Sequence, residues 1–257
     1  MTMHPFVALM RRYCIDYTNS HDLTVCDEIM EPDYVVHISG FDLIRDESYG
    51  PAVTDIFQRA PGLGLVVHEF VLNGDRLCMR FSEHASMPVE SGRRLACWRG
   101  IGLYKWNGRR LTENYVEQDY LAMHEQLATG VPHPLEAPHL DPWMSTEVVA
   151  PDPVAEKTVL AWLERGDLAD TTSVVDPADV TVNDLFSAGP RVPFHVTVRG
   201  PYIGGIDDVP DDHIGTDVTM QVAGIAHVGH EGETIDNVQA VCTRMGVRAQ
   251  LTGASPV

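Results

Sequence analysis

The chain has 257 residues, which is long for one compact α+β domain and sufficient for two domains of roughly 100–150 residues each. Hydrophobic residues make up 44% of it and charged residues 21%, so a buried core is expected. The 37 acidic residues outnumber the 18 basic ones, and the net charge of -19 argues against nucleic acid and membrane surfaces as partners.

The cysteines and the N-terminus indicate a cytoplasmic protein. Five scattered cysteines form no CxxC pair, which argues against a disulfide framework and against a structural zinc site. The N-terminal stretch MTMHPFVALMRRYC has its arginines after the apolar patch, the reverse of the order in a secretory signal. No run approaches the roughly 18–20 apolar residues of a membrane span.

The first half predicts helices followed by an antiparallel meander. Apolar and aromatic residues at helical spacing predict three helices, over residues 5–19, 22–30 and 48–59. Runs of strand-like composition predict five strands, over residues 34–38, 65–72, 76–86, 94–106 and 111–119. The Asn-Gly pairs at 73–74 and 107–108 are strong signals for hairpin turns. We therefore expect an α+β layout with helices on one face of a curved sheet.

Residues 129–153 differ in composition from both halves. They carry six prolines and little periodicity, which is typical of a semi-extended linker. A further helix is predicted over 153–164. The expected organisation is a first domain over 1–128, a linker over 129–153 and a second domain over 154–257.

The second half repeats parts of the first. Residues 21–36 align with 166–181 at an offset of 145. Towards the C-terminus the offset is 124, at which Gly100-Ile101 matches Gly224-Ile225 and Gln126 matches Gln250. Chance similarity between short apolar and polar strings is the alternative. Because two blocks occur in the same order, we expect a tandem duplication whose second copy is trimmed around the third helix and the strand after it.

One strand of the first copy carries most of the chemistry that the sequence offers. Glu113, Tyr115, Glu117 and Asp119 alternate along it and therefore share one face. If that face lined a pocket, like charges and desolvation would raise at least one carboxyl pKa towards neutrality, as general acid–base catalysis requires. The alternative is a solvated acidic face on a very acidic protein.

The second copy lacks these carboxylates. At the offset of 124, Asn237, Val241 and Thr243 stand at the positions of the three acidic residues. The contrast assigns the chemistry to the first copy.

Several motifs within residues 6–128 follow one another in an order typical of a known family. They are Gly74-Asp75-Arg76, Arg80, Ser82-Glu83-His84, Ser91-Gly92-Arg93, Glu113-x-Tyr115-x-x-x-Asp119 and Gln126-Leu127. In their order and spacing, the first half resembles the SnoaL-like polyketide cyclases of the nuclear transport factor 2-like superfamily. Two departures, Glu83 in place of a small residue and Tyr115 in place of tryptophan, indicate a pocket remodelled for another ligand.

The resemblance implies a fold and a catalytic role. The implied fold is two tandem nuclear transport factor 2-like (cystatin-like) domains, each a cone-shaped sheet wrapped by helices around a pocket, with the second domain degenerate. The superfamily includes cyclases, ketosteroid isomerases, dehydratases, epoxide hydrolases and binding modules, so the fold does not select a reaction. In the cyclases, the aspartate that matches Asp119 acts as the acid/base.

The candidate site residues follow from the acidic strand and the resemblance together. We expect Asp119 to be catalytic, with His84 or Glu117 assisting. The substrate-binding candidates are Tyr17, His37, Trp98, Tyr115 and Glu113. The alternative for His84 is a structural hydrogen bond, and for Tyr17 and Trp98 it is core packing.

Neither a metal nor a cofactor is expected. The twelve histidines form no HxH or HExxH motif, and the acidic stretch over 200–215 lacks the EF-hand register. Ser86 and Cys97 have no evident base partner, which disfavours a covalent nucleophile.

These observations predict a cofactor-free acid–base enzyme that acts on a hydrophobic, oxygenated small molecule. Polyketide-type cyclisation or isomerisation in specialised metabolism is the first hypothesis, and epoxide opening or dehydration would use the same groups. The competing hypothesis is a non-catalytic binding or accessory protein, in which Asp119 would form a salt bridge with an arginine such as Arg99. The second domain is expected to be a non-catalytic partner that pairs with the first as a pseudo-dimer, with a homodimer as the further option.

Overall fold

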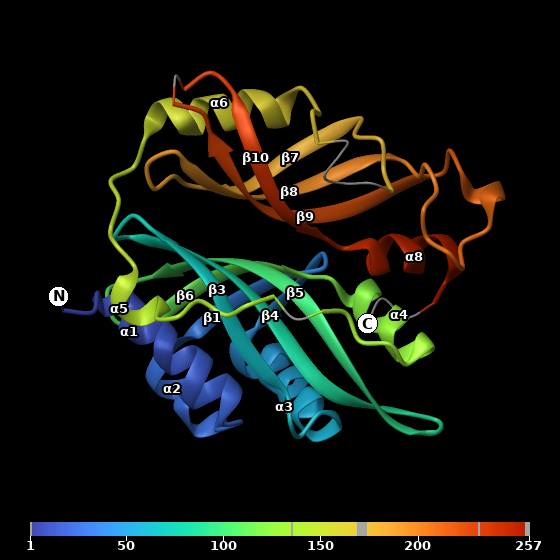
Figure 1. The fold of residues 1–257 in the computed structure, drawn as a ribbon, viewed down its shortest axis with the longest axis horizontal. Coiled ribbons are helices and arrows are strands. Elements are labelled where there is room, and N and C mark those ends of the chain that lie inside the picture. The colour runs from blue at the N-terminus through green and yellow to red at the C-terminus, as the bar shows by residue number, and fades with distance from the viewer. Residues whose placement is uncertain (1, 135, 169–173, 231, 255–257) are drawn as a thin grey trace. The chain divides into compact units, whose positions relative to one another are not determined.

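The computed structural model describes residues 2–134, 136–168, 174–230 and 232–254. The chain divides into two compact units, Met1–Val116 with Ala122–Val148, and Glu117–Leu121 with Val149–Val257. Each unit combines helices with a curved antiparallel meander over its own hydrophobic core, so the α+β class is confirmed (Figure 1).

The helices of the first unit lie together on one face of its sheet (Figure 1). They are α1 (Pro5–Arg11), η1 (Arg12–Asn19), η2 (Leu23–Val25), α2 (Cys26–Ile29), η3 (Arg45–Tyr49) and α3 (Gly50–Arg59). Pro5 opens α1, where its missing N–H is not needed, and the ring of His4 accepts from the backbone N–H of Phe6. The segments η1 and η3 are π-helical, a wide helix type that is rare and often found at functional sites.

A six-stranded sheet forms the other layer of the first unit. Its strands are β1 (Met30–Ile38), β2 (Phe41–Ile44), β3 (Gly64–Leu72), β4 (Arg76–Val89), β5 (Gly92–Trp106) and β6 (Leu111–Gln118), in the order β2-β1-β6-β5-β4-β3. β1 runs parallel to β6, whereas β3, β4 and β5 form the predicted antiparallel meander.

The two Asn-Gly turns are as predicted. The Asn73 side chain accepts from the backbone of Asp75 and Arg76, and Gly74 takes the φ of +103° that L residues avoid. Asn107 and Gly108 repeat this arrangement in the turn between β5 and β6. The turns set the register of the meander, and thereby which side chains share a face.

Residues 122–148 complete the first unit. They contain most of α4 (Tyr120–Thr129) and the short α5 (Pro142–Ser145). The segment between them is tied to the sheet, since the N–H of His139 donates to the carbonyl of Val67 at 3.0 Å and Arg80 binds Glu136 at 2.7 Å. Of the range expected as a linker, 129–148 thus packs in the first unit and 149–153 in the second.

The second unit is a four-stranded sheet with helix α6 on one face (Figure 1). Its elements are α6 (Pro153–Glu164), β7 (Asp179–Leu185), β8 (Arg191–Pro201), η4 (Asp211–His213), β9 (Asp217–Val228), β10 (Ile235–Cys242) and α8 (Arg244–Thr252), with the strand order β10-β9-β8-β7. Asp152 caps α6 by accepting from the N–H groups of Val154 and Ala155. No helix in the described parts of the chain has both the length and the apolar composition to cross a membrane.

The two units share a packing detail between their central strands. Phe81 of β4 lies opposite Gly100 of β5, and Phe194 of β8 lies opposite Gly224 of β9. At both glycines an added Cβ would collide with the phenylalanine ring. Each phenylalanine ring therefore packs directly on the backbone of the neighbouring strand. This close approach is possible only because glycine has no side chain.

A glutamine ties α4 to the sheet of the first unit, and another ties α8 to the sheet of the second unit. Gln126 bonds the N–H and carbonyl of Cys97 at 3.0 and 2.7 Å, and also the carbonyl four residues before it. Gln250 makes the same three bonds, with the N–H and carbonyl of Thr219 at 2.9 and 2.7 Å and with the carbonyl four residues before it. The two glycines and the two glutamines are matched at the offset of 124, whereas Phe81 and Phe194 are 113 residues apart.

The alignment at an offset of 145 matches residues of two strands that do not occupy equivalent positions in the two sheets. It matches the end of β1 with the start of β7, but β7 pairs with β8 at a sheet edge, as β3 pairs with β4. Within its described residues, the second sheet has no strands at the places of β1 and β2. In its sheet, β7 therefore takes the edge position that β3 has in the first sheet, not the position of β1 with which the alignment matches it.

Candidate active site in the first unit

The candidate residues that alternate along β6 and just beyond it do not all belong to one unit. Glu113 and Tyr115 belong to the first unit, whereas Glu117 and Asp119 belong to the second. Within the first unit, it is the opposite face of β6, with Asn114 and Val116, that is buried towards the core. Alternation correctly groups side chains by face but does not say which face is turned inward.

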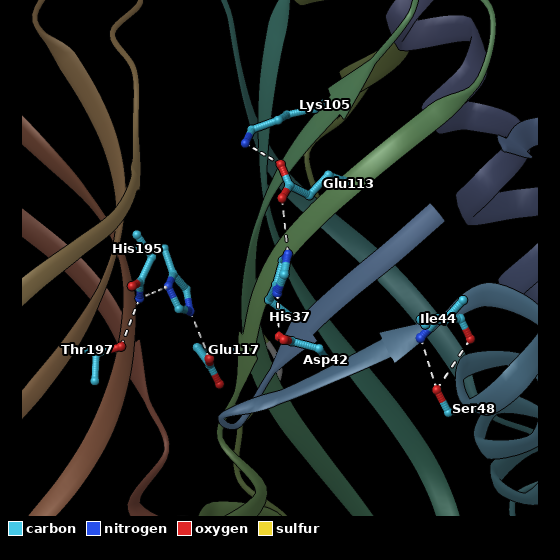
Figure 2. A network of polar contacts seen from close by, with 10 residues as sticks. His37, Asp42, Ile44, Ser48, Lys105, Glu113, Glu117, His195 and Thr197 are labelled. Carbon is cyan, nitrogen blue, oxygen red and sulfur yellow. Dashed lines mark hydrogen bonds and ion pairs between the residues drawn. The ribbon is translucent and has the colours of Figure 1, made fainter. Parts of the chain in front are cut away.

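Glu113 takes part in an ion-pair cluster around His37 (Figure 2), and Tyr115 packs against it. The two ring nitrogens of His37 bond Asp42 at 2.6 Å and Glu113 at 3.1 Å, and Glu113 is also paired with Lys105. The Tyr115 ring stacks on His37 with 4.1 Å between centroids. Burial alone would raise the pKa of Glu113, but Lys105 and His37 together hold it below its usual value. Each charge in this cluster is balanced by a neighbour, which is typical of a structural network.

Glu117 forms a buried pair with a histidine of the second unit (Figure 2). The Nε2 atom of His195 lies 2.9 Å from Glu117, and the two residues are 2% and 0% exposed. The Asn183 amide donates to Nδ1 of His195 at 3.0 Å and to Thr197 at 2.9 Å. Because Nδ1 accepts, Nε2 carries the hydrogen that it donates to Glu117.

Asp119 is bound by an arginine of the second unit. One guanidinium nitrogen of Arg244 lies 2.9 Å from each of the Asp119 carboxylate oxygens. This is the arrangement expected of the non-catalytic alternative, with Arg244 in place of Arg99. His84 belongs to the other unit, where its ring lies against Gly64 and its Nδ1 is buried without a hydrogen-bond partner among the described residues.

A different carboxyl group lies on the buried face of the first sheet. Glu83 of β4 stands opposite Trp98 of β5, and the indole N–H donates to the Glu83 carboxylate. Glu83 shares its face of β4 with the core residues Met79 and Phe81. Although part of the residue remains accessible to solvent, burial raises the pKa of Glu83 from 4.5 to about 7. A carboxyl group with this pKa can exchange protons near neutral pH.

Five tyrosines surround the same interior. Tyr13 and Tyr17 come from η1, Tyr49 from η3, Tyr34 from β1 and Tyr104 from β5. The ring of Tyr13 lies 5.7 Å from that of Tyr104 and 5.8 Å from that of Tyr17, and its hydroxyl lies 3.2 Å from that of Tyr49. Burial raises the pKa of all five phenols, so their hydroxyls stay protonated and can donate hydrogen bonds.

Cys14 links Glu83 to the tyrosines. Burial raises the pKa of its thiol on η1, and the charge of Glu83 adds to this rise; the charge of Cys14 would in turn act on Tyr104. We refer to Glu83, Trp98, Asn114 and the five tyrosines together as the interior polar cluster.

Hydrogen bonds join members of the interior polar cluster. The Tyr34 hydroxyl bonds the Asn114 side chain, and the Tyr17 hydroxyl bonds Tyr49. Tyr17, Tyr34 and Asn114 are 1%, 0% and 1% exposed. Native proteins rarely leave such groups unpaired, because each unpaired group costs about 1–3 kcal/mol.

Sequence reasoning found part of this cluster. Tyr17 and Trp98, both expected to bind substrate, lie in it, and Glu83 is one of the two departures from the family pattern noted in the sequence. Tyr34, Tyr49 and Asn114 were missed, because nothing in the local pattern shows that their side chains meet.

Among the described residues, no group of three or more His, Cys, Asp or Glu side chains is placed to hold a metal ion.

One histidine–serine pair also escaped the sequence analysis. His68 bonds Ser82 at 2.9 Å and the carbonyl of Ala137 at 3.1 Å, and both side chains are buried. The contact holds residues 136–137 to the sheet. Burial lowers the pKa of His68, so the ring is neutral at physiological pH.

Neither a protein-family model nor a curated protein matches this chain. Solved structures match about half of it. IdmH, a candidate polyketide cyclase from Streptomyces antibioticus, is 20% identical, with 48% of this chain and 98% of IdmH covered and a TM-score of 0.44. A candidate SnoaL-like polyketide cyclase from Shewanella denitrificans is 19% identical over 49% of this chain and 98% of its own, with a TM-score of 0.43. AclR, a candidate hydroxylase from Streptomyces galilaeus, is 15% identical over 50% and 98%, with a TM-score of 0.44. SnoaL-like polyketide cyclases are thus among the solved proteins that this chain resembles, the family that its motifs indicated.

Proposed function

We propose that the first unit is a cofactor-free acid–base enzyme acting on a hydrophobic, oxygenated small molecule, with Glu83 as the proton-transfer group. The observation that carries this proposal is a carboxyl group with a pKa of about 7, opposite Trp98 and on the same face of β4 as the core residues Met79 and Phe81. A group with this pKa exchanges a proton in either direction near neutral pH. Strongly perturbed groups of this kind concentrate at functional sites.

Glu83 is favoured over the two carboxyl groups that the sequence analysis named. Both oxygens of Asp119 accept from Arg244, and Glu117 accepts from His195. These carboxylates are held by partners of the second unit. Glu83 instead receives one hydrogen bond from Trp98 and keeps part of its surface open to solvent.

The favoured reaction is removal of a proton from a carbon next to a carbonyl, followed by cyclisation or isomerisation. The Glu83 carboxylate would take the proton, and a tyrosine hydroxyl would donate to the oxygen on which charge develops. Epoxide opening or dehydration would instead use the protonated Glu83 as an acid. The two directions differ in pH dependence, since a base gains activity as the pH rises through about 7 and an acid loses it.

The second unit is proposed to be a shortened, non-catalytic copy of the first. Aligned on the shared phenylalanine–glycine contacts, Val196 and Val222 form the pair that Glu83 and Trp98 form in the first unit. At the offset of 124, Val238 stands at the position of Asn114. Apolar side chains thus replace the polar groups of the interior polar cluster at these positions, which supports a structural role.

Solvent deuterium exchange tests the proposed function. The probe is 2-tetralone, an uncharged ketone with acidic C–H bonds, and its deuterium uptake is followed by proton NMR. We expect the wild-type protein to accelerate uptake with a rate that rises through about pH 7. Glu83→Gln should reduce the acceleration by at least about 100-fold, whereas Glu90→Gln, at an exposed glutamate, should leave it unchanged. Equal rates for Glu83→Gln and wild type would refute the role of Glu83.

A non-catalytic binding protein is the second candidate, and the Asp119–Arg244 ion pair favours it. In that case 2-tetralone would bind the wild-type protein without any acceleration of exchange. Binding measured by calorimetry alongside the exchange rate separates the two functions.

A further inference from the structure

The outer edge of β10 is open, whereas the matching edge in the first unit is covered. β10 and β6 both have 8 residues and align residue for residue at the offset of 124. In the first unit, β1 pairs with β6 in parallel on the side away from β5. Among the described strands of the second unit, none pairs with β10 on the side away from β9. The second sheet therefore ends at a strand whose counterpart in the repeat has a further neighbour.

The pairing of β10 with β9 shows which backbone groups point outward. The N–H of Thr243 donates to a carbonyl of β9 at 3.0 Å. The register is regular over residues 237–242, and the backbone groups of alternate residues point to the same side of a strand. The N–H and carbonyl of Gln239 therefore face β9, whereas those of Val238 and Ala240 point away from it, where another strand can pair with them.

β10 lacks the features by which proteins keep sheet edges apart. Edge strands are usually short, charged, interrupted by proline or a bulge, or covered by another segment. Of the other edge strands in the described sheets, β2 has 4 residues, β3 is bonded to His139 and Val148, and β7 carries Asp179 and Asp184. Over residues 237–242, β10 has no bulge, proline or charged side chain. Its edge is therefore suited to pairing with a further strand.

We infer that this edge pairs with the β10 edge of a second copy of the chain. The Oε1 atom of Gln239 is buried and has no hydrogen-bond partner among the described residues. In an antiparallel pair centred on Gln239, the two Gln239 side chains lie directly opposite each other on one face. Each amide N–H can then donate to the Oε1 atom of the other copy, which supplies the missing partner. A two-fold axis through this pair makes the contact self-complementary and closed.

The register centred on Gln239 also limits repulsion between two acidic chains. Each copy has a net charge of -19, so a charged edge would oppose association. The charged side chain of β10 is Asp236, three residues before Gln239. The two Asp236 residues are then about 20 Å apart, more than twice the Debye length of about 8 Å at physiological salt. In the same register, Val238 of each copy lies opposite Ala240 of the other, so their outward backbone groups join the two sheets.

Sedimentation equilibrium of the full chain tests the second copy as the occupant. A contact between two strand edges is at the weak end of specific interfaces, so we expect a monomer–dimer equilibrium with a Kd on the order of 10 µM. Gln239→Glu places two carboxylates opposite each other and should raise this Kd at least about tenfold. Thr181→Glu adds the same charge at an exposed position of the β7 edge and should leave it unchanged. A wild-type chain that is monomeric at about 100 µM, or a Kd unchanged by Gln239→Glu, would overturn the inference.

Cysteine cross-linking tests the register. Directly opposite residues of a non-hydrogen-bonded antiparallel pair have Cα atoms about 4.5 Å apart, which is within the range of a disulfide. Gln239→Cys should therefore form a covalent dimer under mild oxidation, seen on a non-reducing gel, with the wild type as the background from the native cysteines. In Asn237→Cys, the matched control, the two new thiols would lie on residues about 14 Å apart and should not cross-link. Cross-linking of Asn237→Cys but not of Gln239→Cys would overturn the register.

Hydrogen exchange followed by NMR locates the contact without any substitution. The N–H groups of Val238 and Ala240 should exchange more slowly as the protein concentration rises through the Kd, whereas that of Gln239, which already faces β9, should not change. A synthetic peptide of residues 234–243 tests the other occupant, an extended segment of a different protein. Binding of this peptide at β10 of a chain that does not dimerise would show that the edge accepts a foreign strand, and would overturn the second copy as its partner.

Discussion

Trp98 donates its indole N–H to the carboxylate of Glu83 across the pair of strands β4 and β5. The contact stabilises the charged form of a carboxyl group that burial otherwise keeps protonated. Glu83 therefore has a pKa of about 7, so it changes charge near neutral pH. Four predictions follow from this contact and from the ion pairs of the second unit.

Trp98→Phe should raise the pKa of Glu83. A hydrogen bond to a charged group contributes about 1.5–3 kcal/mol, so its loss should move the midpoint upward by about one pH unit or more. Carbon-13 NMR of glutamate-labelled protein measures the midpoint directly, and the pH profile of deuterium exchange should shift with it. Trp106→Phe, on the same strand but stacked on Phe6, should leave the midpoint where it is. An unchanged midpoint in Trp98→Phe would show that the indole does not stabilise the charge.

Glu83→Gln should change how stability depends on pH. Below pH 4.5 both folded and unfolded states hold the proton, and between 4.5 and about 7 only the folded state holds it, so the wild type loses stability as the pH rises. The loss levels off above about pH 7 and reaches at most about 3 kcal/mol. Urea unfolding at about pH 5 and about pH 8 should show that the variant lacks this decline, while Glu90→Gln keeps it. Parallel curves for Glu83→Gln and wild type would contradict the raised pKa.

His195→Ala should strongly destabilise the second unit. It removes the Nε2–H donor that faces the completely buried Glu117, and a hydrogen bond to such a carboxyl group is worth about 1.5–3 kcal/mol. Glu117→Gln keeps an acceptor for Nε2 of His195 and should cost less. Urea unfolding of the two variants ranks them, and a smaller loss in His195→Ala than in Glu117→Gln would mean that Nε2 of His195 does not donate to Glu117 as described.

Asp119→Asn separates the two catalytic assignments. If Glu83 transfers the proton, the variant weakens its contact with Arg244 and loses stability, but it keeps deuterium exchange within about threefold of wild type. A folded Asp119→Asn protein that loses most of its exchange activity would instead return the acid–base role to Asp119. Arg244→Met serves as the control, because it disrupts the same ion pair and leaves the carboxyl group in place.

The sequence by itself determined the local structure and the class of the fold. Helical spacing, Pro5, and the Asn-Gly turns act over a few residues, so the helices and the meander of the first unit could be predicted from composition and order. The repeat at an offset of 124 was also visible, because glycine and glutamine at fixed positions have few substitutes in the contacts that Gly100 and Gln126 make.

Only the tertiary structure decided which face of β6 is buried, and with it where the candidate site lies. Alternation along the strand places Asn114 and Tyr115 on opposite faces of the sheet. It does not say which of the two faces is buried. The partners of Glu117 and Asp119 are 78 and 125 residues away along the chain, beyond the reach of any local pattern. Glu83 acquires a pKa of about 7 from burial, which depends on every element that covers it.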